Sequence, residues 1–105
     1  MFKYTKHQLK KIEGLLEEIG YTIRYERGNF QSGYALVENR KIAVINKFFD
    51  TEARINSLLE ILSSIEVDVS KFDEKTAEYY NVLTTKVLSE LNQEKELKIM
   101  LDEHQ

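Results

Sequence analysis

The sequence contains no cysteine, no proline and no tryptophan. Without cysteine, the chain has no disulfide, no thiolate nucleophile and no sulfur ligand for a structural zinc ion. A chain of this length and average composition would carry about five prolines, and their absence leaves glycine and asparagine to form the turns. Stability must therefore come from a hydrophobic core, for which the apolar fraction of 42% is sufficient.

Histidine is nearly as scarce. The two histidines, His7 and His104, lie near opposite ends of the chain and are not expected to meet in one site. Catalysis by proton transfer or by a nucleophile would then depend on carboxylates, tyrosines or lysines, and there is no aspartate-rich calcium loop. The sequence favours a non-catalytic protein with no metal and no cofactor over an enzyme.

Long apolar runs are also absent. Residues 1–7 lack the apolar stretch of a secretory signal, and no run approaches the roughly 20 residues that a membrane helix needs. We therefore expect a cytoplasmic protein that does not enter a membrane. A length of 105 residues is that of one domain, so residues 1–105 are expected to form a single domain.

Charge is unevenly distributed along the chain. Residues 1–47 carry a net charge of +4 and residues 48–105 a net charge of −7, within a total of −3. Such an asymmetry is typical of an anion-binding face or of a surface that pairs with its opposite on a neighbouring molecule. An uneven but merely solvated surface is the alternative.

Three segments have the apolar spacing of amphipathic helices. The first covers about 5–19, with Thr5 as its N-cap and Gly20 just after its end. The second covers about 51–64. The third is expected to begin at Ser70, where Asp73 follows at the spacing of a capping box, and to continue through 73–91.

Between the first two helices the apolar period changes to two, which indicates β-strands at about 21–27, 34–38 and 41–46. The third of these strands is apolar on both faces and is expected to be the most buried. The predicted fold is therefore α+β, in the order α-β-β-β-α-α, with a three-stranded antiparallel sheet packed on one face against helices 5–19 and 51–64. The predicted core consists of Leu9, Ile12, Leu16, Ile23, Leu36, Ile42, Val44, Ile55, Leu58, Leu59 and Leu62.

Basic, amide and aromatic side chains on the polar face of the predicted strand 21–27, in the loop after it and at the end of the predicted strand 41–46 form the candidate ligand-binding surface. A loop that exposes a phenylalanine beside arginines can stack a nucleobase or hold an anion. The same phenylalanine can instead cover one end of the core as part of a small satellite cluster. The residues of this surface are Arg24, Arg27, Asn29, Phe30, Asn46 and Lys47.

One part of the chain resembles a known family. A strand ending at residues 43–47 and a helix at residues 52–62 are similar to the core of small bacterial zinc metallopeptidases, in which a helix under a short antiparallel sheet carries HExxH. The matching stretch, residues 59–63, reads Leu-Glu-Ile-Leu-Ser, so only Glu60 agrees with the motif. The resemblance covers about 21–65 and implies an inactive relative that keeps the fold without zinc. The whole chain also resembles small conserved bacterial proteins of unassigned function.

The C-terminal segment, about 70–105, is the expected interaction element. Its apolar stripe is wider than one contact with a small sheet domain requires, and the candidate interface residues are Tyr79, Tyr80, Leu83 and Val87. The sequence thus favours a protein-interaction module that binds another protein or a second copy of itself, with a homodimer slightly preferred to a monomer. Binding of nucleic acid or a nucleotide through the basic loop surface is the alternative, beside the inactive metallopeptidase relative.

Overall fold

The computed structural model describes residues 2–27, 34–88, 97 and 100–101. The chain divides into two compact units, Met1–Phe72 and Asp73–Gln105. The prediction of one domain over residues 1–105, with about 70–105 as its interaction element, stays a prediction. The order of helices and strands in the described residues is the predicted one, and the fold is α+β.

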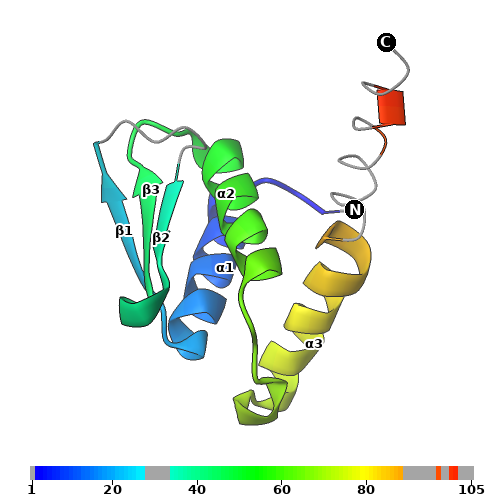
Figure 1. The fold of residues 1–105 in the computed structure, drawn as a ribbon. Coiled ribbons are helices and arrows are strands. Elements are labelled where there is room, and N and C mark those ends of the chain that lie inside the picture. The colour runs from blue at the N-terminus through cyan, green and yellow to red at the C-terminus, as the bar shows by residue number, and fades with distance from the viewer. Residues whose placement is uncertain (1, 28–33, 89–96, 98–99, 102–105) are drawn as a thin grey trace. The chain divides into compact units, whose positions relative to one another are not determined.

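The first unit contains two helices and a sheet (Figure 1). Its elements are α1 (Lys6–Ile19), β1 (Thr22–Glu26), β2 (Tyr34–Val37), the short 3-10 turn η1 (Glu38–Arg40), β3 (Ile42–Asn46), α2 (Thr51–Ser64) and the 3-10 turn η2 (Val69–Lys71).

The ends of α1 and α2 are set by local hydrogen bonds. The Thr5 hydroxyl accepts from the backbone N–H of Gln8 at 3.1 Å, and the Asp50 carboxylate accepts from that of Ala53 at 2.9 Å. Gly20 ends α1 with a φ of 107°, a left-handed conformation that costs glycine little. The predicted boundaries of both helices are confirmed because they depend on these neighbouring residues alone.

The sheet is mixed, so the expected antiparallel sheet is wrong. Its strand order is β1-β3-β2: β2 pairs antiparallel with β3, whereas β1 pairs parallel with it. The prediction took all three strands as antiparallel, but β3 is apolar on both faces and is better buried between two neighbours. That central position leaves β1 only the far edge of β3.

The buried face of β3 is also the opposite of the predicted one. Ala43 and Ile45 are fully buried, while Ile42 and Val44 lie on the other face and are partly exposed. The two faces of a strand exchange when the register moves by one residue. Since all four side chains are apolar, the sequence pattern did not distinguish the faces.

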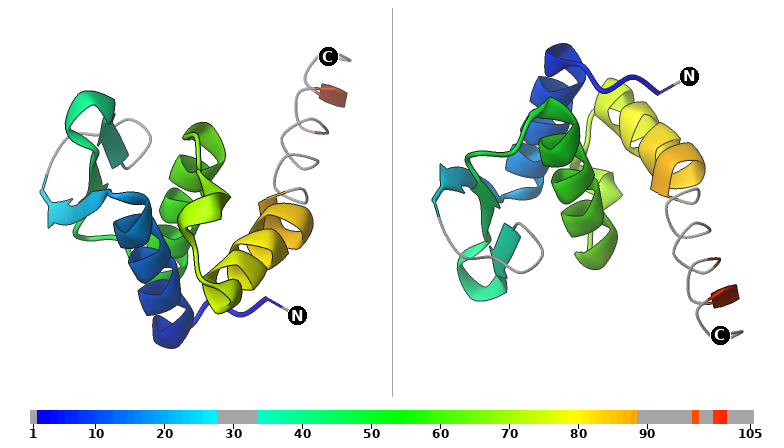
Figure 2. Two further views of the ribbon diagram at one scale, coloured as in Figure 1. Left: turned by 90° about the horizontal axis from the view of Figure 1, so that it is seen from below. Right: turned by 90° about the horizontal axis from the view of Figure 1, so that it is seen from above.

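Both helices of the first unit cover the same face of the sheet (Figure 1, Figure 2). The register places Ile23, Tyr25, Leu36 and the buried side chains of β3 on that face. Ile23 and Leu36, which were predicted as core, are only half-buried. The buried apolar residues of this unit are Leu9, Ile12, Leu15, Leu16, Tyr21, Ala43, Ile45, Ile55, Leu58, Leu59, Ile61 and Leu62.

The second unit begins with α3 (Glu74–Val82), followed by a π-helical turn at Leu83–Leu88. Asp73 is the N-cap, because its carboxylate accepts from the backbone N–H of Thr76 at 2.8 Å. The predicted start at Ser70 is wrong, since Asp68 caps η2 through Ser70 instead and the chain turns before α3. Residues 89–91 of the predicted helix lie outside the described residues.

Candidate interaction site

The carboxyl ends of β1 and β3 meet because these two strands run parallel. Glu26 is paired with Asn46 at the end of the register, and the backbone N–H of Lys47 donates to the Glu26 carbonyl at 3.1 Å. Arg27 and Lys47, which follow the two strands, therefore leave the sheet side by side. Ligands commonly bind at this edge of parallel strands in α/β proteins.

Phe48 is the exposed aromatic residue at this edge. Its side chain is 64% exposed, the Arg27 guanidinium lies 5.4 Å from the centre of its ring, and the Lys47 ammonium lies 5.3 Å from it. Both distances are within the range of cation–π contacts. We call Arg27, Lys47 and Phe48 the Phe48 patch.

Arg54 of α2 is hydrogen-bonded to the loop that carries Phe48. Its Nη2 donates to the Lys47 carbonyl at 2.9 Å and its Nε donates to the Phe49 carbonyl at 3.0 Å. In addition, the Asn46 side-chain oxygen accepts from the backbone N–H of Phe48 at 3.0 Å. The loop is thus fixed before any partner arrives, which reduces the entropy lost on binding.

Arg54 is itself positioned by an aromatic contact. Its guanidinium lies 4.4 Å from the centre of the Tyr25 ring, and the Tyr25 hydroxyl donates to the Glu13 carboxylate of α1. Burial, and next the hydrogen bond and charge of Glu13, raise the pKa of Tyr25, while the charge of Arg54 opposes that rise. The network ties the Phe48 loop to α1, β1 and α2.

The structure brings together three of the predicted ligand-binding residues. Arg27, Asn46 and Lys47 surround Phe48. Arg24 is not among them, because it faces the open side of the sheet and forms a 2.6 Å salt bridge with Glu26. Asn29 and Phe30 lie outside the described residues.

Phe48 itself was missed by the sequence prediction. The available signal was the pair Phe48-Phe49 between a strand and a capped helix, where only one of two adjacent rings faces the core. Phe49 is half-buried and Phe48 projects outward. Which ring would be exposed depends on the turn after Asn46, which the sequence pattern does not specify.

The predicted interface residues of the second unit differ in exposure. Leu83 is fully buried, Tyr79 and Tyr80 are half-buried, and Val87 lies in the π-helical turn. Other apolar side chains of this unit are more accessible. Val82 is 46% exposed, and the helical residues Leu97, Met100 and Leu101 are 56–59% exposed.

The stretch that matches HExxH lacks ligands for zinc. Leu59 is fully buried in the core, and the Ser63 hydroxyl donates to the Glu60 carbonyl at 2.7 Å. The pKa of Tyr34 is raised by burial and then by the charge and hydrogen bond of Glu60, so that glutamate is engaged with β2. Within the described ranges, no three acidic or imidazole side chains gather closely enough to hold a metal ion.

The comparisons with known proteins return no relative. No family model matches the chain, and neither the curated proteins nor the solved structures give a significant match.

No helix in the described part of the chain has the length and apolarity to cross a bilayer.

Proposed function

We propose that the protein is a non-catalytic protein-interaction module and that the Phe48 patch is its recognition site. The observation that carries this proposal is a largely exposed phenylalanine with two cations in contact with its ring, on a loop that is hydrogen-bonded to Arg54. The few residues that contribute most of the binding energy in protein interfaces are enriched in aromatic and arginine side chains. A rigid loop that presents both is well suited to bind a partner.

The side chains of the Phe48 patch indicate which groups a partner should carry. An apolar side chain would cover Phe48, and carboxylates beside it would pair with Arg27 and Lys47. An acidic amphipathic segment has both features. The second unit of the chain is such a segment, because it carries four lysines and eight carboxylates and exposes Leu97, Met100 and Leu101. The favoured partner is therefore a second copy, in a reciprocal dimer.

Nucleic acid fits the patch less well. Strong binding to phosphates requires several basic contacts, whereas Arg24 is already paired with Glu26 and the chain has a net charge of −3. The alternative has a distinct signature, because binding to phosphates weakens log-linearly as salt rises.

Sedimentation equilibrium across the micromolar range tests the proposal. The wild-type protein should form a dimer, and Phe48→Ala should weaken it by about a thousandfold, because a reciprocal dimer loses two interface anchors worth about 2 kcal/mol each. Val69→Ala, which trims another exposed apolar residue, should leave the dimer intact.

Two results would reject the proposal. The first is a Phe48→Ala variant that dimerises as strongly as the wild type. The second is a monomeric wild-type protein that binds a single-stranded oligonucleotide through Phe48 with a steep salt dependence, which would identify a nucleic-acid-binding protein instead.

A further inference from the structure

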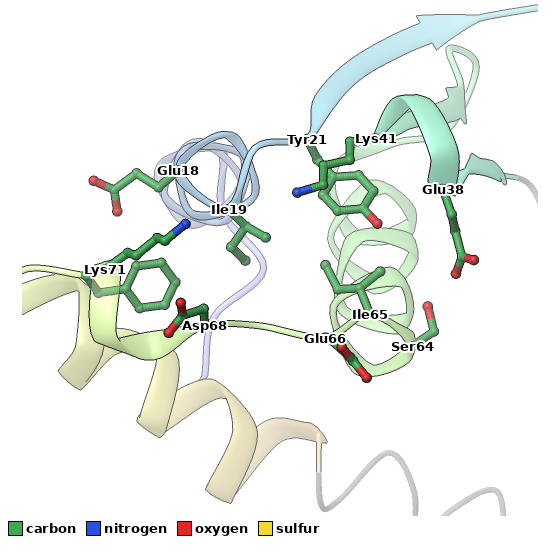
Figure 3. Close-up of a pocket in the computed structure, with 11 residues that line it drawn as sticks. Glu18, Ile19, Tyr21, Glu38, Lys41, Ser64, Ile65, Glu66, Asp68 and Lys71 are labelled. Atoms are coloured by element: carbon green, nitrogen blue, oxygen red, sulfur yellow. The ribbon is translucent and has the colours of Figure 1, made fainter.

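A pocket of about 570 Å³ lies in the first unit, away from the Phe48 patch. It is bordered by the C-terminal ends of α1 and α2 and by the turns η1 and η2, whereas the patch lies at the N-terminal end of α2 (Figure 3). Its apolar lining includes Ile19, Tyr21, Ile65 and Phe72. The volume is that of sites for small molecules.

Lys41 enters this pocket from an unusual backbone conformation. Its φ and ψ are 52° and 51°, in the left-handed region that favours glycine or asparagine over lysine. Its N–H donates to the Glu38 carbonyl at 3.1 Å, and its carbonyl accepts from the Thr22 N–H at 2.8 Å. Lys41 closes the turn η1 in this conformation at an energetic cost, and residues held in such sparsely populated conformations are found more often at functional sites.

The Lys41 side chain runs over Gly20. A Cβ atom at Gly20 would lie 3.7 Å from both Cδ and Nζ of Lys41, so the ammonium is directed across the end of α1. Figure 3 shows the ammonium groups of Lys41 and Lys71 pointing toward Ile19 from two sides of the pocket. Neither forms a salt bridge or hydrogen bond with a side chain of the described residues.

The carboxylates of the pocket do not point toward Ile19 as the two ammonium groups do. Asp68 already accepts hydrogen bonds from the Ser70 N–H and hydroxyl at 3.1 and 2.6 Å; these bonds, and to a lesser extent the Lys71 charge, lower the pKa of its carboxyl. Glu18 points away from Ile19, while Glu38 and Glu66 lie at the other end of the pocket, near Ser64 (Figure 3).

The charges of the lining exclude some ligands. Four carboxylates outnumber the two ammonium groups, so a polyanion such as a nucleotide would be repelled. A metal ion is also unsuitable, since within the described ranges no three acidic or imidazole groups converge. A ligand with one anionic group, an apolar body and one cationic group matches the arrangement.

We propose that this pocket binds a small apolar zwitterion of the amino-acid or short-peptide class with a free carboxylate. The ligand carboxylate would lie between Lys41 and Lys71, its apolar side chains would contact Ile19 and Phe72, and its amino group would face Glu38 and Glu66. The two ammonium groups bind the carboxylate, and the opposite acidic end fixes the orientation of the ligand.

Titration of the full-length protein with the dipeptide leucyl-phenylalanine, followed by NMR, tests the proposal. Saturable shifts at Gly20, Tyr21 and Phe72 are expected, with a dissociation constant of about 1 mM or tighter. The C-terminal amide should bind about tenfold more weakly because it loses a charge-assisted contact, and the N-acetyl derivative should also be weakened. Absence of saturable shifts, or an amide that binds as well as the free acid, rejects the proposal.

Lys41→Asn separates binding from folding. Asparagine tolerates the left-handed conformation, so this variant should melt no lower than the wild type while its affinity for the dipeptide falls about tenfold. Lys71→Gln should lose affinity likewise, and Lys10→Gln, on an exposed part of α1, should change nothing. The losses in Lys41→Asn and Lys71→Gln should disappear when the amide is the ligand. Variants of Lys41 and Lys71 that bind the dipeptide as tightly as the wild type would overturn the assignment.

Discussion

Arg54 joins the core of the first unit to the loop that carries the Phe48 patch. Its side chain is in contact with Tyr25 of β1, and its two hydrogen bonds reach the carbonyl groups of Lys47 and Phe49. A guanidinium suits this position because its planar donors diverge toward two acceptors while its face stacks on a ring. A lysine at this position would supply charge without that geometry.

Arg54→Met tests the role of this residue. Methionine keeps an apolar side chain over Tyr25 but removes both donors, so the free energy of unfolding should fall by about 1–3 kcal/mol. Urea denaturation measures this loss, and Arg40→Met at an exposed position serves as the control. The variant should also weaken the dimer, because Phe48 is no longer held in place. Equal stabilities for Arg54→Met and Arg40→Met would show that the loop does not depend on these bonds.

At the scale of the elements, the sequence predicted what depends on neighbouring residues and missed what depends on distant ones. Thr5, Gly20 and Asp50 fix the ends of α1 and α2 through bonds to residues three or four positions away. The parallel pairing of β1 with β3 joins residues 20 positions apart, such as Thr22 and Ile42, and the buried face of β3 is set by the tertiary packing of the sheet against α1 and α2. Residues 42–45 are apolar on both faces and therefore contain no pattern from which to read that packing.

Two isoleucines in β3 test the observed face directly. Ile45 is fully buried and Ile42 lies on the opposite face, so the same substitution should have unequal effects. Ile45→Ala should lower the free energy of unfolding by about 2–5 kcal/mol, and Ile42→Ala by about 1 kcal/mol. Chemical denaturation of both variants measures the difference, and a larger loss for Ile42→Ala would contradict the register.

At the scale of the whole molecule, the charge asymmetry is the feature that the sequence displayed best. The second unit carries eight of the 18 carboxylates and only four of the 15 basic residues, and this was evident without a structure. The candidate site was predicted in part: Asn46 ends β3 and Arg27 and Lys47 follow strands, and the sequence pattern shows where strands end. Phe48 was missed because its exposure depends on one turn. Lys41, which lines the pocket, was also missed, because its left-handed conformation depends on the hairpin around it.

A mixing experiment tests whether the basic patch of one copy binds the acidic unit of another. In a reciprocal dimer each copy supplies one Phe48 patch and one apolar C-terminal stripe, which consists of Leu97, Met100 and Leu101. The dimer therefore has two equivalent contacts. Phe48→Ala damages both contacts through the patch, and Leu97→Glu damages both through the stripe, so each variant alone should be largely monomeric. An equal mixture should contain heterodimers, because the intact patch of the Leu97→Glu chain meets the intact stripe of the Phe48→Ala chain.

One contact is restored in that heterodimer and the other remains broken, so the mixture should associate more weakly than the wild type but more strongly than either variant. Sedimentation equilibrium of the separate variants and of the mixture measures this difference. A dimer that joins two Phe48 patches to each other predicts a different result, since every heterodimer would then contain one damaged patch. In that case the Leu97→Glu variant would remain dimeric and mixing would restore nothing. Recovery of dimers on mixing therefore distinguishes a contact between unlike surfaces from a contact between like ones.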